Sequence, residues 1–228
     1  MPLETFFNLP DAKRTLVEEA AIDEFAAKPY QCASISAIVA RAKIAKGSFY
    51  QYFSDKKDLY RHVLRLVQQR KKELVSSLTV PSISLDTFAY LRWMIQLAVL
   101  FEMRHPKLAH IERLAFLEQP LPTDDDPENG YTPGSTNQFK DFLIQGILHD
   151  DLATWVDTDM AACMISAIYH QLPPYLIERM GEKARSIADG SVDIAYDPLT
   201  QDLFDNCMDL LEAGMARDPQ IRKDFFSK

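Results

Sequence analysis

Residues 45–53 (AKGSFYQYF) combine apolar and hydrogen-bonding side chains at helical spacing. In a helix, Phe49 and Phe53 would lie on one face and the polar groups on the other. The polar set comprises Lys46, Ser48, Tyr50, Gln51 and Tyr52. Ammonium, hydroxyl and amide groups of this kind hydrogen-bond to phosphate oxygens and to the edges of bases. The stretch therefore predicts recognition of a nucleic acid.

A second short helix must hold this one in place. Residues 34–42 (SISAIVARA) predict that helix, with Ser34 as its N-cap and Ile38 and Val39 on its apolar face. Lys43 and Ile44 remain as a tight turn between the two helices. Two short helices joined by a tight turn, the second basic and aromatic, form the helix-turn-helix pattern of DNA-binding proteins.

Two longer helices flank this pair. Residues 11–27 predict an amphipathic helix, which Pro29 ends by pushing the residue before it out of the helical region. Asp55 and Asp58 resemble an acidic capping pair and predict the start of a helix that runs to about residue 78.

The net charge of −8 argues against DNA as a partner, because phosphates attract basic groups. The charge is unevenly distributed, however. Residues 34–75 hold 10 Lys and Arg against 3 Asp and Glu, whereas residues 76–228 hold 12 basic against 24 acidic groups. This asymmetry predicts a basic nucleic-acid-binding segment joined to an acidic body with another role.

Residues 17–64, roughly 48 of 228, resemble the N-terminal domain of the TetR (tetracycline-repressor-like) family of transcriptional regulators. The likeness is strongest over residues 42–59 (AKIAKGSFYQYFSDKKDL), where the family shows text similar to AGVSKGTLYHYFKSKEEL. The resemblance implies a homodimer that binds a palindromic double-stranded DNA operator. It also implies a small-molecule effector, whose binding would release a repressor from that operator.

The resemblance further implies roles for single residues. Ser34 would contact a phosphate through its hydroxyl and N–H, and Lys56 matches a phosphate-binding lysine at the start of the next helix. The N-terminal end of the second short helix would enter the major groove. The DNA-binding residues implied are Ser34, Ser36, Lys46, Gly47, Ser48, Tyr50, Gln51, Tyr52 and Lys56.

Three residues depart from the family pattern. Pro29 replaces the glycine that usually follows the first helix, and Lys43 replaces the glycine of the turn, where a positive φ is expected. A residue other than glycine there costs about 1 kcal/mol if the geometry is kept. Ala45 lacks the hydroxyl that often caps the recognition helix, a loss of roughly 0.5–2 kcal/mol. None of these changes removes a predicted DNA contact.

The rest of the chain is also predicted to be helical. Helices are expected at about 85–104, 107–118, 137–149, 157–180 and 198–216. The first of these is apolar on more than one face, which predicts a central position in a bundle. Pro173 and Pro174 must kink or split the helix at 157–180. Residues 119–135 (QPLPTDDDPENGYTPGS) predict a long mobile loop.

These elements predict an all-α protein with two domains. An N-terminal three-helix helix-turn-helix DNA-binding domain would occupy residues 1–55, and a fourth helix from about 55 to 78 would connect it to the remainder. A larger helical ligand-binding and dimerisation domain would occupy residues 79–228. The last two helices resemble the pair that forms a four-helix dimer interface in the family, although the core of a single chain would need apolar stripes of the same kind. The stripes consist of Met160, Cys163, Met164, Ala167, Leu203, Cys207, Leu210 and Leu211.

Effector-binding residues are harder to select. Aromatic and polar side chains embedded in apolar helices are the candidates, although each is also compatible with an ordinary core or surface position. They are Trp93, Gln96, Phe101, His110, Arg113, Phe116, Tyr169, His170 and Tyr175.

Other classes of site find little support. The three cysteines form no CxxC pair and are predicted to be reduced, mostly buried thiols of a cytoplasmic protein, and the five histidines show no HExxH spacing. No metal, cofactor or catalytic residue is therefore expected, and the protein is predicted not to be an enzyme. No apolar run reaches the ~18 residues of a membrane span.

Two alternatives remain open at this stage. The first is an all-α small-molecule-binding protein or enzyme without a DNA role. The second is a DNA-bound regulator whose body binds a protein partner. An activator is also compatible with the sequence.

Overall fold

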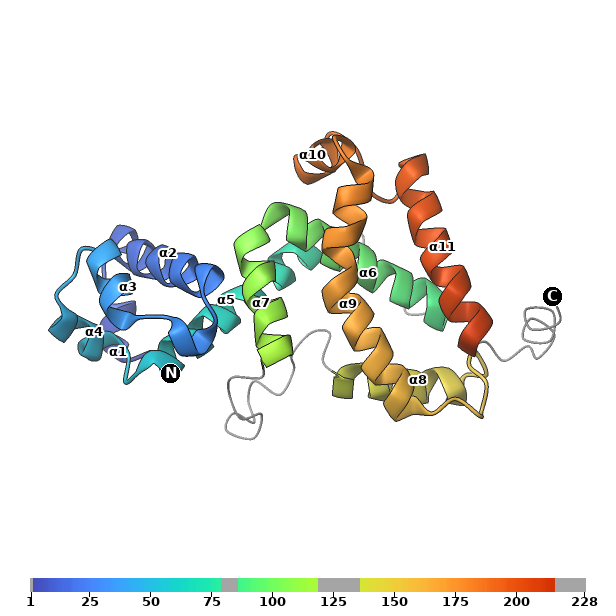
Figure 1. Cartoon of the computed structure of the whole chain (residues 1–228), viewed down its shortest axis with the longest axis horizontal. Coiled ribbons are helices and arrows are strands. Elements are labelled where there is room, and N and C mark those ends of the chain that lie inside the picture. Colours follow the sequence, from blue (N-terminus) through green and yellow to red (C-terminus); the bar gives the residue numbers. More distant parts are fainter. Residues whose placement is uncertain (1, 79–85, 119–135, 216–228) are drawn as a thin grey trace. The chain divides into compact units, whose positions relative to one another are not determined.

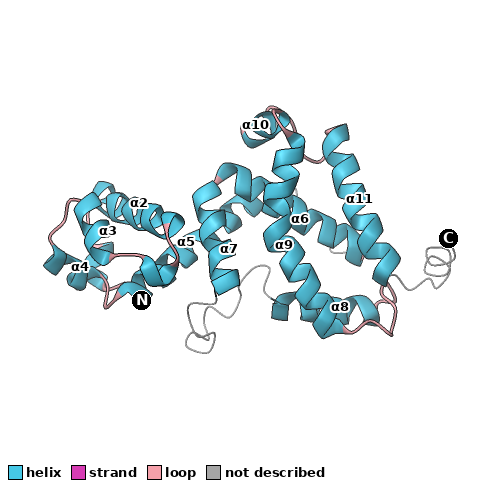
Figure 2. Ribbon diagram, in the orientation of Figure 1, coloured by secondary structure: helices cyan, strands magenta, loops and turns pink. Residues whose placement is uncertain are grey.

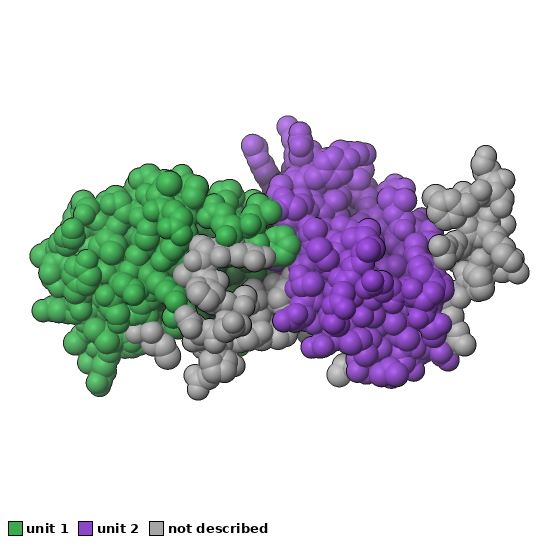
Figure 3. All heavy atoms as spheres, turned by 60° about the horizontal axis from the view of Figure 1, so that its bottom comes forward, with its two compact units in different colours: residues 1–74, 105–130 green, residues 75–104, 131–228 purple. Residues whose placement is uncertain are grey.

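The structure is a computed structural model that describes residues 2–78, 86–118 and 136–215 (Figures 1 and 2). Within these ranges every long element is an α-helix and no strand occurs, which confirms the all-α class. The loop predicted at 119–135 lies outside the described residues. The chain divides into two compact units, one of residues 1–74 and 105–130 and the other of residues 75–104 and 131–228 (Figure 3).

The first unit contains the predicted helix-turn-helix. Its helices are α1 (Glu4–Phe7), α2 (Asp11–Ala27), α3 (Ile35–Arg41), α4 (Lys46–Tyr52), α5 (Lys56–Ser76, whose last two residues belong to the second unit) and α7 (Pro106–Glu118). A 3-10 turn, η1 (Tyr30–Cys32), separates α2 from α3. The bounds of α2 are those predicted, and those of α3, α4 and α5 agree within about two residues. The sequence did not predict α1 or η1.

Local signals explain where the helices of this unit begin and end. Lys28, which precedes Pro29, has φ −145° and ψ 145° and ends α2. The Ser34 Oγ accepts a hydrogen bond from the Ala37 N–H at 3.4 Å and caps α3. At the start of α5, the Asp58 N–H donates to Asp55 Oδ1 at 2.7 Å, which confirms the predicted acidic cap.

The helix α7 packs against α2 in the first unit. An ion pair of 2.6 Å between Lys107 Nζ and Asp23 Oδ1 joins their surfaces. The Tyr30 N–H also donates to the Glu118 carboxylate at 3.3 Å. A helix that follows residue 79 in the sequence is therefore part of the same compact unit as the helix-turn-helix.

The second unit is a bundle around one central helix. It contains α6 (Thr87–Arg104), α8 (Thr136–Leu148), α9 (Thr158–Met180), α10 (Lys183–Ala188) and α11 (Pro198–Met215). The helix α6 contacts the other four, as its apolar faces predict. The helix α9 runs without a break through Pro173 and Pro174, so the predicted split does not occur. The helix α10 falls in a stretch for which no helix was predicted.

Candidate nucleic-acid interface

The turn between α3 and α4 has the geometry that the sequence predicted. Lys43 has φ 54°, in the left-handed region that normally favours glycine. The Ile44 N–H donates to the Val39 carbonyl at 3.1 Å and closes the turn. Ala45 is the N-cap of α4 and its side chain provides no capping acceptor, as expected. The two helices are held together by buried apolar side chains, since Val39 is 6% exposed and Phe49 is fully buried.

The outer face of α4 presents hydrogen-bonding groups to solvent. Lys46, Gly47 and Gln51 are exposed, Tyr50 is 51% exposed, and Ser48 is half-buried. Apart from the chain neighbours of Gly47 and the backbone of its own helix, no atom of the described residues lies within 4 Å of the position that a Cβ would occupy. Packing within the described part of the chain therefore does not require a glycine at the start of this helix.

Tyr52 is placed differently from a DNA-contacting residue. It is 7% exposed, and its ring centroid lies 6.2 Å from that of Phe6. It follows Phe49 by three residues, so both side chains lie on the buried face of α4.

The partner of Tyr52, helix α1, holds the C-terminal end of α4. The Leu3 N–H donates to the Tyr52 carbonyl at 2.8 Å, and the Thr5 hydroxyl donates to the Gln51 carbonyl. These bonds satisfy carbonyls that have no partner within the helix. Sequence reasoning missed this contribution, for which the signal was the aromatic pair Phe6 and Phe7 ahead of Pro10.

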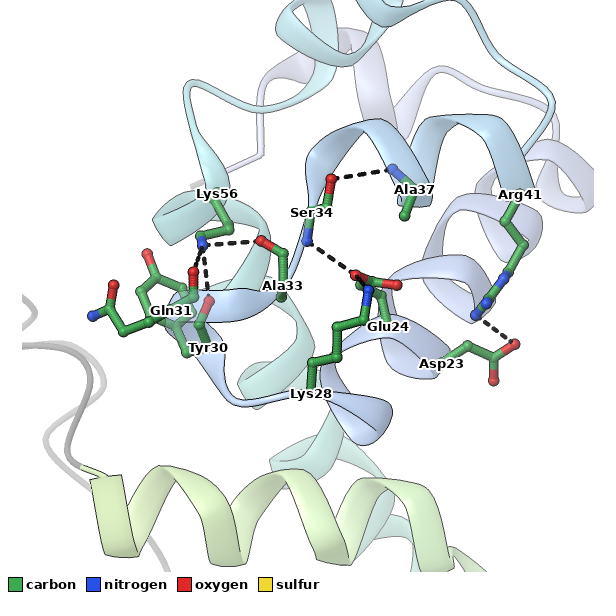
Figure 4. Close-up of polar contacts among 10 residues, drawn as sticks. All are labelled: Asp23, Glu24, Lys28, Tyr30, Gln31, Ala33, Ser34, Ala37, Arg41 and Lys56. Atoms are coloured by element: carbon green, nitrogen blue, oxygen red, sulfur yellow. Dashed lines mark hydrogen bonds and ion pairs between the residues drawn. The ribbon is translucent and has the colours of Figure 1, made fainter.

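Ser34 is tied to the interior of the protein on one side (Figure 4). Its N–H donates to Glu24 Oε1 at 3.0 Å, and the same carboxylate accepts from Lys28 Nζ at 2.8 Å. The hydrogen bond from Lys28 and that from Ser34 lower the pKa of Glu24, although burial opposes them. The Ser34 N–H, predicted to contact phosphate, is thus engaged by Glu24, whereas its hydroxyl proton remains a donor.

Lys56 is also engaged within the protein. Its ammonium donates to the carbonyls of Tyr30, Gln31 and Ala33 at 2.8, 3.1 and 3.0 Å (Figure 4). Ser36, by contrast, is exposed on α3. The structure therefore brings Ser36 and the outer face of α4 to the surface, and it places Tyr52 and Lys56 among internal contacts.

The cysteines correct one expectation. Cys32 is exposed, because it lies in η1, a turn that the sequence did not predict. Cys163 is exposed as well, and Cys207 is half-buried. In the described part of the chain, no three His, Cys, Asp or Glu residues are grouped so that they could hold a metal ion. None of the helices in that part is long and apolar enough to cross a membrane.

The predicted effector-binding residues divide between the two units. Six lie on α6 and α9, which pack against each other in the second unit: Trp93, Gln96, Phe101, Tyr169, His170 and Tyr175. Of these, Phe101, Tyr169 and His170 are at most 5% exposed. A second group, His110, Arg113 and Phe116, lies on α7 in the first unit. Tyr175 is 51% exposed, and its hydroxyl accepts a hydrogen bond from Arg179 at 2.8 Å.

The exposed outer face of α4, carried by a turn of this geometry, defines a DNA-binding protein of the helix-turn-helix class. The sequence model described as "Bacterial regulatory proteins, tetR family" matches residues 19–63. A crystal structure of a TetR family transcriptional regulator from Chloroflexus aurantiacus J-10-FL is 36% identical, over 96% of this chain and 100% of that one, with a TM-score of 0.75. The chain therefore belongs to the TetR family and is a transcriptional regulator.

More distant structures share the fold. CprB from S. coelicolor A3(2) is 18% identical, over 93% of this chain and 94% of its own, with a TM-score of 0.59. The regulator FadR from Bacillus subtilis, in complex with stearoyl-CoA, is 19% identical, over 77% and 93%, with a TM-score of 0.53. No curated protein matches the sequence closely enough to count as a relative.

Proposed function

We propose that this protein is a homodimeric repressor that binds a palindromic operator and is released from it by a small molecule. The observation that carries the proposal is the exposed polar face of α4. A short helix with Lys46, Tyr50 and Gln51 on its outer face can enter a major groove and reach both phosphates and base edges.

The contacts can be divided by chemistry. Tyr50 and the hydroxyl of Ser34 suit phosphate oxygens, which position the protein without reading sequence. Gln51 and Lys46 suit base edges, since an amide can pair with adenine and an ammonium with guanine. Ser36 and Ser48 complete the surface on α3 and on the first turn of α4.

Dimerisation is supported by an apolar face of the second unit. The helices α9 and α11 contact each other, and both expose large apolar side chains to solvent. Met160 is 64% exposed, Met164 57% and Leu210 69%. Apolar groups of this size, gathered on two adjacent helices, are typical of an interface between subunits. A twofold dimer would present two copies of α4 to half-sites about 34–36 Å apart or a multiple of that distance.

The effector is proposed to bind in the second unit, between α6 and α9. The helix α9 carries the buried polar side chains of Tyr169 and His170, and α6, which packs against it, carries the half-buried Trp93 and Gln96. FadR, which shares the fold, carries stearoyl-CoA in its structure. Because linkage is reciprocal, operator and effector must weaken each other by the same factor. We assign the protein no catalysis and place it in the cytoplasm with its DNA.

Fluorescence anisotropy tests the proposal. The full-length protein would be titrated into a labelled duplex taken from upstream of its own coding sequence, at several salt concentrations. We expect one dimer to bind with an affinity that falls steeply with salt, because Lys and Arg release counterions from the phosphates. Absent or salt-insensitive binding would contradict a DNA-binding role, and a monomer in sedimentation velocity would contradict the dimer.

A further inference from the structure

The Lys56 ammonium donates hydrogen bonds to three backbone carbonyls of the helix-turn-helix unit. We propose that Lys56 is a positioning residue, which fixes the turn before α3 and through it the DNA-facing end of that helix, and that it makes no phosphate contact. This inference rests on the proposed DNA-binding function, because its consequence is measured on operator affinity.

The donors of Lys56 are fully used. A lysine ammonium has three N–H groups, and here three carbonyl oxygens lie within hydrogen-bond distance, at 2.8, 3.0 and 3.1 Å. Lys56 Nζ also lies 4.7 Å from the centroid of the Tyr30 ring, with which it forms a cation–π interaction. A phosphate oxygen could therefore bond to Lys56 only by displacing one of the carbonyls.

The three carbonyls converge because the chain folds into η1 after Pro29. Their positions follow from Tyr30, whose ring centroid lies 4.9 Å from that of Tyr60 on α5. Tyr60 is 2% exposed and packs edge-on against Phe25 of α2. Aromatic contacts with α5 and α2 thus hold the turn in place. The ammonium of Lys56 binds the backbone oxygens that this arrangement brings close together.

Lys56 affects the DNA-facing surface by way of Ser34. The Ala33 carbonyl, which accepts from Lys56, belongs to the peptide group whose N–H is that of Ser34. That N–H donates to Glu24, which is 3% exposed, and the Ser34 Oγ caps α3. This peptide group is held by Lys56 from α5 on one side and by Glu24 from α2 on the other (Figure 4). The start of α3 is therefore fixed by two long side chains.

Three variants separate positioning from phosphate binding. Lys56→Met removes the charge and the donors but keeps the length of the chain, and Lys57→Met removes the same charge at the next residue as a matched control. Lys56→Arg keeps a charge that binds phosphate well, but its planar guanidinium cannot direct donors to three converging carbonyls. Operator affinity would be measured for each at several salt concentrations, with thermal melting to establish that each variant folds.

Positioning predicts that Lys56→Met and Lys56→Arg both bind more weakly than Lys57→Met. Operator affinity should fall on the order of tenfold for each helix-turn-helix unit of the dimer, if the turn adopts its binding-competent form about a tenth of the time. The slope of log K against log salt should equal that of Lys57→Met. Had Lys56 contacted phosphate, the slope of Lys56→Met would be shallower by about 0.9 for each lost contact, and Lys56→Arg would bind normally.

Hydrogen exchange provides a readout that does not depend on DNA. In Lys56→Met the peptide covering residues 29–37 should exchange faster than in the wild type, whereas peptides from α9 should not change. Unchanged exchange at 29–37, or faster exchange with wild-type affinity, would overturn the inference. If the wild-type protein failed to bind any DNA, the proposed function would fail, and the exchange measurement would still decide whether Lys56 holds the turn.

Discussion

Lys71 Nζ lies 2.7 and 2.5 Å from the two carboxylate oxygens of Glu112, and this ion pair joins α5 to α7 within the first unit. Lys71 is 4% exposed and Glu112 is 8% exposed. Two charges removed from water in this way are stable only together, because each would be strongly disfavoured without its partner.

We therefore expect either single variant, Lys71→Met or Glu112→Leu, to lower the free energy of unfolding by about 3–5 kcal/mol. The double variant should recover most of that loss, since it leaves no unpaired charge in the interior. Urea denaturation of the wild type, the two single variants and the double variant would measure the interaction free energy of the pair in a double-mutant cycle. Losses that simply add in the double variant would show that the two charges do not stabilise each other.

The helix α1 gives a second prediction. Phe6 is fully buried against Tyr52 and Phe53, whereas its neighbour Phe7 is 51% exposed. Phe6→Ala should lower the free energy of unfolding by about 3–5 kcal/mol, and Phe7→Ala should have a much smaller effect. Chemical denaturation monitored by circular dichroism would compare them. Equal effects of the two substitutions would contradict the placement of α1 on α4.

Gly47 offers a separation of stability from function. Because the position of its Cβ is open, Gly47→Ala should raise stability by up to about 0.5–1 kcal/mol, through the better helix propensity of alanine. In the proposed complex the same methyl group would meet DNA, so operator affinity should fall. Melting curves and anisotropy on the same preparation would measure both quantities. A Gly47→Ala protein that binds operator normally would remove this glycine from the interface.

Lys43 makes a prediction about the turn alone. Its φ of 54° is unfavourable for a residue with a Cβ, so Lys43→Gly should stabilise the protein by roughly 1 kcal/mol. Lys46→Gly, which places glycine in the first turn of a helix, should destabilise it by up to about 1 kcal/mol. Thermal melting of the two variants provides the comparison, and a destabilised Lys43→Gly would contradict the left-handed turn.

The acid stability of the second unit should depend on Asp197. Its carboxylate accepts from Lys183 Nζ at 2.7 Å and from the Thr200 hydroxyl at 2.7 Å, and these bonds lower the pKa of Asp197 from 3.8 to about 2. A lowered pKa in the folded state stabilises the protein above the unfolded value, and this stabilisation is lost as the pH falls from about 4 to about 2. Asp197→Asn should flatten the dependence of Tm on pH in that window. The exposed Asp202→Asn is the control, and identical profiles for both variants would exclude the role of Asp197.

Local signals explain why much of the DNA-binding unit could be predicted. Pro29, Ser34 and the pair Asp55 and Asp58 each act on the backbone within four residues, so their effect is visible in the sequence. The internal role of Lys56 was not predictable in this way. Its three carbonyl partners precede it by 23 to 26 residues, and they converge only because η1 forms.

The position of α7 illustrates the same limit. The residues 105–118 have an ordinary helical pattern, which does not indicate the helices that they pack against. Lys71 and Glu112 are 41 residues apart, and neither residue alone predicts a buried ion pair. Tyr52 is a further example. Its spacing from Phe49 places it next to the apolar face of α4, but its burial also depends on Phe6 of α1, a helix that was not predicted.

The exposed thiol of Cys32 makes the turn before α3 available to site-specific labelling. In a Cys163→Ser, Cys207→Ser background it would be the single cysteine of each chain. A nitroxide attached there would place one spin label on each helix-turn-helix unit, so that the distance between the two labels could be measured. Pulsed electron paramagnetic resonance could then follow the separation between two such labels in a dimer as DNA and candidate effectors are added.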